Sequence, residues 1–185
     1  MESVNQNVET FASAQGLLDS WNGDTNCVFV LDVRMPGMSG MILQDQLRDM
    51  SSVVPIIFIT GYGDVSTAVQ AMRNGAFDFV QKPFRNQDLI DTIQDALAAG
   101  SLARKIQRQR ERALQRLARL THRERQVLDM IVDGKRNKVI ASDLALSQRT
   151  VEVHRASVMR KMDVDSVAAL VRTVLIANDN LQPPW

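Results

Sequence analysis

Three short apolar runs stand out in the first half of the chain, at residues 27–31, 55–59 and 77–80. Continuous apolar runs of this length are typical of strands that are buried on both faces, as in a parallel sheet. Pro55 opens the second run, and proline is tolerated as the first residue of a strand. The three runs therefore predict three strands of one parallel sheet.

The segments that follow these runs have the spacing of amphipathic helices, with apolar side chains every three or four positions. These segments are residues 40–50, 64–73 and 86–99. Residues 8–11 form a further candidate strand, and residues 13–21 form its helix. The regular alternation of strand and helix predicts an α/β fold.

Residues 101–119 differ from this pattern because they are rich in Lys and Arg, with Glu111 as the only acidic residue. We interpret them as a helix that continues out of the first domain as a linker. Two roles stay open for this segment: a solvated basic helix, and a short coiled-coil contact with a second subunit.

From residue 121 onward the whole pattern is helical. Thr121 and Glu124 have the spacing of a capping box, in which the two side chains satisfy the first free backbone donors of a helix. Asn137, Ser147 and Ser166 are the candidate N-caps of three further helices. The second and third of these four helices are joined by a short turn, which fits a helix-turn-helix.

The net charge of the chain, +1, conceals two halves of opposite sign. Residues 1–100 contain 5 Lys/Arg and 12 Asp/Glu, a net charge of −7, whereas residues 101–185 contain 17 Lys/Arg and 9 Asp/Glu, a net charge of +8. This split predicts two modules with different partners. The usual partner of a strongly basic module is nucleic acid.

Composition excludes several classes of protein. With Cys27 as the only cysteine, a disulfide framework and a cysteine-rich zinc site are excluded. No apolar stretch approaches the roughly 20 residues that a bilayer requires, and no secretory signal precedes the first domain. We therefore expect a cytoplasmic protein with no membrane partner.

A polar side chain follows each of the three predicted strands: Asp32, Thr60 and Lys82. In an open parallel sheet, chemistry gathers at the carboxyl ends of the strands. An aspartate can act as a nucleophile towards phosphorus, while an ammonium group and a hydroxyl can hold the oxygens of the phosphoryl group. The pattern therefore indicates a site that accepts a phosphoryl group.

The segments LDVRMPGMSG, IIFITGYGDV and FVQKPF resemble the receiver domain of two-component response regulators, over roughly residues 8–100. The resemblance implies that a sensor histidine kinase phosphorylates Asp32, and that Lys82 and Thr60 bind the phosphate. It implies that Phe79 turns inward when Thr60 moves. It also implies a cis peptide before Pro83.

For a complete receiver, the resemblance implies Mg²⁺, held in part by Asp32 and by the backbone carbonyl of Arg34. Receivers begin with a strand that ends in two acidic residues, and this chain lacks such a strand. Asp32 alone is expected to bind Mg²⁺ weakly. Two explanations stay open: a sequence that is truncated at its N-terminus, and a degenerate receiver that no longer takes phosphate.

The third predicted helix of the basic half, residues 148–162, has two distinct faces at 100° per residue. The side chains expected to pack inward are Val151, His154, Val158 and Met162. The opposite face is expected to carry Arg149, Val153, Ala156 and Arg160, flanked by Glu152 and Ser157. Such a face fits a DNA major groove, because Arg contacts guanine edges or phosphates and small apolar side chains contact thymine methyls.

The segment from Leu120 to Ser166 resembles the LuxR-type four-helix DNA-binding domain, and the whole chain resembles the NarL/FixJ class of response regulators. Within that class it is similar to the regulators of styrene and toluene degradation. The residues implied to lie at or near double-stranded DNA are Arg136, Lys138, Arg149, Thr150, Glu152, Val153, Ala156 and Arg160. The resemblance also implies activation as a homodimer, through the 64–73 helix and the third strand, and contact with RNA polymerase.

These observations predict a receiver over residues 1–100, a helical linker over 101–119 and an all-α DNA-binding domain over 120–185. The expected function is phosphorylation-controlled regulation of transcription. The alternative is a DNA-binding regulator that works without phosphorylation and has a vestigial receiver. A phosphatase of the haloacid dehalogenase type needs a second Asp two residues after the nucleophile, and Arg34 stands there, so we expect no enzyme.

Overall fold

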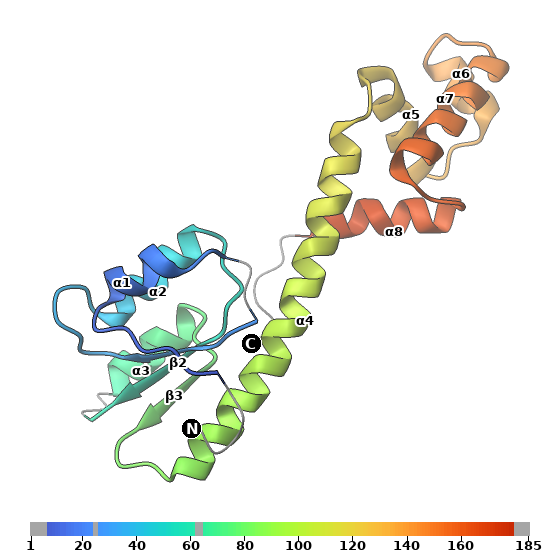
Figure 1. The fold of residues 1–185 in the computed structure, drawn as a ribbon. Coiled ribbons are helices and arrows are strands. Elements are labelled where there is room, and N and C mark those ends of the chain that lie inside the picture. Colours follow the sequence, from blue (N-terminus) through green and yellow to red (C-terminus); the bar gives the residue numbers. More distant parts are fainter. Residues whose placement is uncertain (1–6, 24–25, 62–64, 180–185) are drawn as a thin grey trace. The chain divides into compact units, whose positions relative to one another are not determined.

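The structure is a computed structural model that describes residues 7–23, 26–61 and 65–179. The chain divides into two compact units, with the division between Arg104 and Lys105. Figure 1 shows the order of the elements along the chain. Among the described residues, no helix is both long enough and apolar enough to cross a membrane.

The first unit contains a parallel sheet of three strands in the order β1-β2-β3. Their bounds are β1 Phe29–Asp32, β2 Ile56–Thr60 and β3 Asp78–Gln81. Each strand begins and ends one or two residues later than its apolar run. The helices described in this part of the chain are α1 Ala14–Ser20, α2 Gly40–Asp49, α3 Val65–Arg73 and α4 Asn86–Ala118, the last of which ends in the second unit. The α/β fold expected from the alternating pattern is confirmed.

Side chains of successive strand residues point to opposite faces of this sheet, so each face has its own core. On one face Ile56 and Phe58 are buried with Leu43 and Leu47 of α2 and with residues of α1 and α3. On the other face Ile57 is buried with Leu89 and Ala96 of α4. The strands are therefore covered on both sides, as their continuous apolar runs predict.

The prediction of a strand at residues 8–11 is wrong. The segment has no regular secondary structure, and Val8 and Phe11 are exposed. A strand needs a ladder partner, and the strand expected between this segment and β1 is not among the described residues. The adjoining helix is confirmed as α1, which Ser13 caps.

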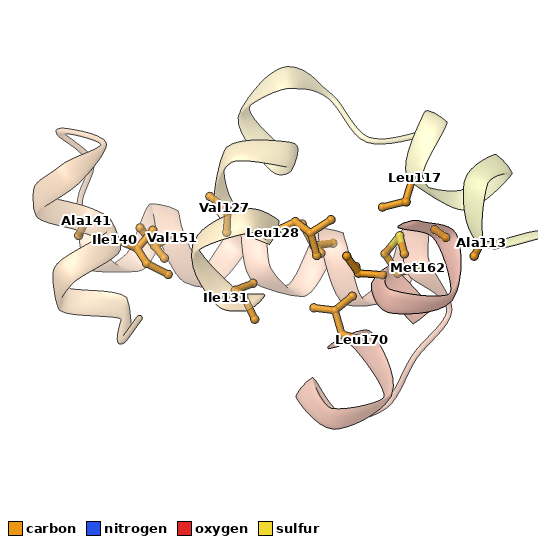
Figure 2. Close-up of a cluster of buried hydrophobic side chains, with 13 residues drawn as sticks. Ala113, Leu117, Val127, Leu128, Ile131, Ile140, Ala141, Val151, Met162 and Leu170 are labelled. Carbon is orange, nitrogen blue, oxygen red and sulfur yellow. The ribbon is translucent and has the colours of Figure 1, made fainter. Parts of the chain in front are cut away.

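The second unit is helical and consists of the end of α4 together with α5 His122–Val132, α6 Asn137–Asp143, α7 Gln148–Met162 and α8 Val167–Asn178. Figure 2 shows its single core, in which α5, α6, α7, α8 and the last turns of α4 all take part. Thr121, Ser147 and Ser166 cap their helices as expected. The expected cap at Asn137 is wrong, because Arg136 occupies the N-cap position and Asn137 is the first helical residue.

Candidate functional site

Asp32 is the last residue of β1, and its carboxylate lies where the strand gives way to a loop. The backbone N–H of Arg34 donates to Oδ1 of Asp32 at 3.0 Å, and Lys82 Nζ donates to Oδ2 at 3.0 Å. The side chain of Asp32 is 35% exposed and that of Lys82 is 42% exposed. The carboxylate is therefore held in one orientation and is still open to an approaching reactant.

The register of the sheet brings Thr60 and Lys82 to the same edge as Asp32. Asp32 pairs with Ile59 of β2, and Thr60 pairs with Gln81 of β3, so each polar residue lies at the end of its strand. The backbone N–H of Lys82 donates to the carbonyl of Thr60 at 2.7 Å. The peptide bond between Lys82 and Pro83 is cis, as the resemblance implied. Thr60 is buried, with 3% of its surface exposed.

A glycine allows α2 to begin directly against this edge. Gly40 is the first residue of α2, and its N–H donates to the carbonyl of Val33 at 3.2 Å. A Cβ at this position would lie 2.5 Å from the backbone oxygen of Asp32 and 2.9 Å from the ring of Phe58. Any larger residue would push α2 away from the end of β1, because atoms cannot approach so closely.

The surroundings of Asp32 favour its ionised form. Partial burial raises the pKa of the carboxyl, but the hydrogen bonds from the Arg34 backbone and the Lys82 ammonium outweigh it and hold the pKa below its ordinary value. The group is therefore an anion at neutral pH. A partly exposed carboxylate can attack phosphorus, and a neighbouring cation partly neutralises the negative charge of the acyl phosphate that forms.

The described residues do not form a complete magnesium site. No cluster of three His, Cys, Asp or Glu side chains lies within metal-binding reach of one another in the described part of the chain. Lys82 already occupies one oxygen of the Asp32 carboxylate, at 3.0 Å. Mg²⁺ requires octahedral oxygen ligands, and this donor set does not fit it.

Phe79 lies in β3, paired with Phe58 of β2. Its ring is half-buried and packs against the same cluster as Phe58, on the face of the sheet that α2 covers. Phe79, the aromatic residue expected to turn inward, therefore lies in β3 shortly before Lys82. Thr60 lies in the neighbouring strand, β2.

The exposed face of α7 carries the residues expected at DNA. Arg149, Glu152, Val153, Ala156 and Arg160 are all exposed, and Val153 is 63% exposed despite its apolar side chain. The opposite face is buried in the core through Val151, Val158 and Met162. Thr150 is half-buried, and its hydroxyl lies 2.8 Å from that of Ser147. Arg136 and Lys138, at the start of α6, are exposed.

Glu124 joins the start of α5 to α7, a link that the sequence pattern did not show. Its carboxylate accepts hydrogen bonds from Lys161 Nζ at 2.6 Å and from Ser157 Oγ at 2.7 Å, besides the Thr121 N–H of its capping box. The Lys161 ammonium outweighs the burial of this group and lowers the pKa of Glu124 to about 2. Ser157 and Lys161 are spaced i, i+4 on α7, so their side chains lie on the same side of the helix. This spacing is the sequence signal that indicates a shared partner for the two side chains, although it does not identify that partner.

Two family models match the chain. The response regulator receiver domain matches residues 1–94, and the luxR family of bacterial regulatory proteins matches residues 118–174. The first match contains the edge of the sheet with Asp32, and the second contains the exposed face of α7.

Known proteins match nearly the whole chain. The transcriptional regulatory protein TdiR of Thauera aromatica is 41% identical over 175 residues, which cover 95% of this chain and 77% of TdiR. The response regulator protein TodT of Pseudomonas putida is 40% identical over 182 residues, which cover 98% of this chain and 80% of TodT. A low-resolution structure of the response regulator StyR has a TM-score of 0.79 and 41% identity, covering 94% of this chain and 87% of StyR.

Proposed function

This chain belongs to the two-component response regulators that join a receiver domain to a LuxR-type DNA-binding domain, and we propose that Asp32 is its phosphoacceptor. Its function is phosphorylation-controlled regulation of transcription, and its family is one of transcription regulators rather than of enzymes. The observation that supports Asp32 is the 3.0 Å contact between its carboxylate and Lys82, at the edge that Thr60 also reaches.

In the proposed reaction, one carboxylate oxygen of Asp32 attacks the phosphorus of a donor, a phosphohistidine of a sensor kinase, while the bond to the histidine nitrogen breaks. Lys82 then pairs with the new phosphoryl oxygens, which carry more negative charge than the carboxylate did. Receivers as a family use Mg²⁺ in phosphorylation.

The proposed consequence is a movement of Thr60 towards the phosphoryl group and a rotation of Phe79 into the space that this vacates. Phe79 belongs to β3 and packs in the same cluster as Ala71 of α3, and Thr60 pairs with Gln81 of β3. On α3, Val65, Val69 and Met72 are exposed at i, i+4 and i+7 spacing, which makes one apolar stripe. An exposed stripe of this kind supports a homodimer through α3 and β3 in the phosphorylated state.

The proposed output is binding to double-stranded DNA by α7, with Arg136 and Lys138 on phosphates. The residues proposed at or near the bases are Arg149, Thr150, Glu152, Val153, Ala156 and Arg160. A homodimer would place two copies of α7 on two half-sites about one DNA turn apart. RNA polymerase is the further partner that we propose for the DNA-bound dimer, since the relatives are transcriptional regulators.

We also propose that the receiver domain covers residues 1–100, the helical linker residues 101–119 and the DNA-binding domain residues 120–185.

Labelling with acetyl phosphate tests the phosphoacceptor. We expect the full chain to take up radioactive phosphate and Asp32→Asn to lose the label, because the amide cannot form an acyl phosphate. The control is Asp49→Asn, an exposed carboxylate at the end of α2, which should keep the label. A label that persists in Asp32→Asn means another acceptor. An unlabelled wild-type chain that binds DNA equally with and without donor supports the phosphorylation-independent alternative.

A further inference from the structure

The last turns of α4 and the end of α7 enclose a groove of about 440 Å³ within the second unit. We call it the basic groove, because its lining includes Arg112, Arg116, Arg119, Arg160 and Lys161 but a single acidic residue, Asp163.

Packing of α4 explains why these cations gather. Ala113 and Leu117 of α4 are buried beside Met162, the last residue of α7, as Figure 2 shows. On a helix, residues at i, i+4 and i+7 share one side. Once Ala113 and Leu117 face the core, Arg112, Arg116 and Arg119 form a neighbouring row beside the end of α7. The same core packing that anchors α4 therefore orients its arginines into the basic groove.

Two of the five cations are neutralised within the protein. Arg116 pairs with Asp163 at 2.6 Å and also donates to the carbonyl of Met162 at 3.1 Å. Lys161 pairs with Glu124 at 2.6 Å.

The other three cations, Arg112, Arg119 and Arg160, are exposed and have no acidic partner within ion-pair distance in the described part of the chain. Among the described residues, the guanidinium of Arg160 donates one hydrogen bond, to the hydroxyl of Ser157 at 3.3 Å. Three uncompensated guanidinium groups around one hollow repel each other, and an anion that enters the hollow relieves this repulsion. The planar guanidinium fork matches the geometry of phosphate.

Arg160 also belongs to the exposed face of α7 and lies about 16 Å along the helix from Arg149, at 1.5 Å per residue. The basic groove is therefore continuous with the face proposed to bind DNA. We propose that it binds the phosphodiester backbone of DNA beside the base pairs that α7 contacts, with Arg112 and Arg119 on successive phosphates. This inference rests on the proposed function. It adds the end of α4 to the DNA interface.

The test measures binding of the full chain to a mixed-sequence 30-bp duplex over a series of NaCl concentrations. For Arg112→Ala/Arg119→Ala we expect the slope of log K against log [NaCl] to become shallower by about 1.8, because each phosphate that the protein neutralises adds about 0.9 to its steepness. Arg112→Lys/Arg119→Lys should keep the wild-type slope, because the charge stays. The control is Lys105→Ala/Arg172→Ala, which removes the same charge from exposed positions outside the basic groove and should leave the slope nearly unchanged.

Four outcomes separate the hypotheses. An unchanged slope in Arg112→Ala/Arg119→Ala, while Arg149→Ala weakens binding, overturns the assignment of the basic groove to DNA and leaves the proposed function intact. An equal change of slope in the control pair also overturns it, since general charge would then explain the effect. Binding of inorganic pyrophosphate that depends on Arg112 and Arg119, with an unchanged DNA slope, shows a small-anion site instead. If the affinity of the wild-type chain for DNA does not change with NaCl concentration, the proposed function itself is contradicted.

Discussion

At the scale of single residues, two carboxylates with lowered pKa values have opposite roles. Asp32 is about one-third exposed and has one oxygen bound to a partly exposed lysine, so a reactant can still reach it. Glu124 is buried, with 7% of its side chain exposed, and Lys161, Ser157 and Thr121 surround it. Glu124 therefore orients the C-terminal half of α7 and is closed to chemistry.

Glu124→Gln tests this orienting role. The folded state holds the pKa of Glu124 at about 2 against an ordinary 4.5, so its ionisation stabilises the fold above about pH 5, and this contribution disappears as the pH falls towards 2. At pH 7 we expect the free energy of unfolding of the variant to fall by about 3 kcal/mol, because folding lowers the pKa of Glu124 from 4.5 to about 2 and each pKa unit corresponds to about 1.4 kcal/mol.

Urea unfolding at pH 7 and at pH 3 measures this difference. The gap between wild type and Glu124→Gln should narrow at pH 3, because the Glu124 carboxyl is protonated in the unfolded chain at this pH while it is still ionised in the folded protein. Glu111→Gln is the matched control, since Glu111 is an exposed acid on α4, and its stability should follow the wild type at both values. A gap that is equal at the two pH values would show that ionisation of Glu124 does not stabilise the fold.

At the scale of elements, α4 is a helix of 33 residues that contributes to the cores of both units. Sequence pattern predicted a helix over 86–99 that continues as a linker, and a continuous helix is what the structure contains. A glycine lies within it. A Cβ at Gly100 would lie 2.7 Å from Cδ and 2.8 Å from Cγ of Pro55, the residue before β2. The rigid ring of Pro55 leaves little room for adjustment.

Gly100→Ala is therefore expected to destabilise the first unit. In an exposed helix interior this change stabilises by up to about 1 kcal/mol, because alanine has the higher helix propensity. Here the close approach of Pro55 reverses the sign, and we expect a net destabilisation of about 1–2 kcal/mol from overpacking. Ser101→Ala, at the next and exposed position, is the control and should be neutral or slightly stabilising. Chemical denaturation measures both variants; a more stable Gly100→Ala would contradict the close approach of α4 to Pro55.

At the scale of the whole molecule, the chain has separate hydrophobic cores and separate charges. The core of the helical unit shares no residue with the two cores that flank the sheet, among the described residues. The acidic half carries the candidate phosphoacceptor and the basic half carries the candidate DNA face. Each unit therefore has its own source of stability and its own chemistry, which suits a protein that receives a signal in one part and binds DNA with the other.

Leu128→Ala should destabilise one unit selectively. Leu128 is fully buried in the core of the second unit, and removal of a buried leucine side chain costs about 2–5 kcal/mol. In differential scanning calorimetry we expect two transitions for the full chain, of which one moves to lower temperature in the variant. If both transitions move together by the same amount, the two cores unfold as a single cooperative unit.

The sequence by itself determined the class of the described elements, apart from the strand expected at residues 8–11, and placed the three strands of the sheet to within two residues. Strand runs, capping residues and the spacing of Asp32, Thr60 and Lys82 are local signals, and parallel strands necessarily bring their carboxyl ends to one edge. The inward and outward faces of α7 likewise follow from helical periodicity alone. For these reasons the receiver and LuxR-type folds could be predicted from the order of the residues.

Only the tertiary structure decided which distant residues meet. The capping box showed Glu124 bound to Thr121, but its partner Lys161 lies 37 residues away. Residues 8–11 have the composition of a strand, but in the described residues they have no ladder partner. The arginines of α4 look like a solvated helix face in sequence, and it is the packing of Ala113 and Leu117 that brings them beside Arg160. Periodicity specifies which side of an element is buried, whereas the identity of the element packed against it depends on the whole fold.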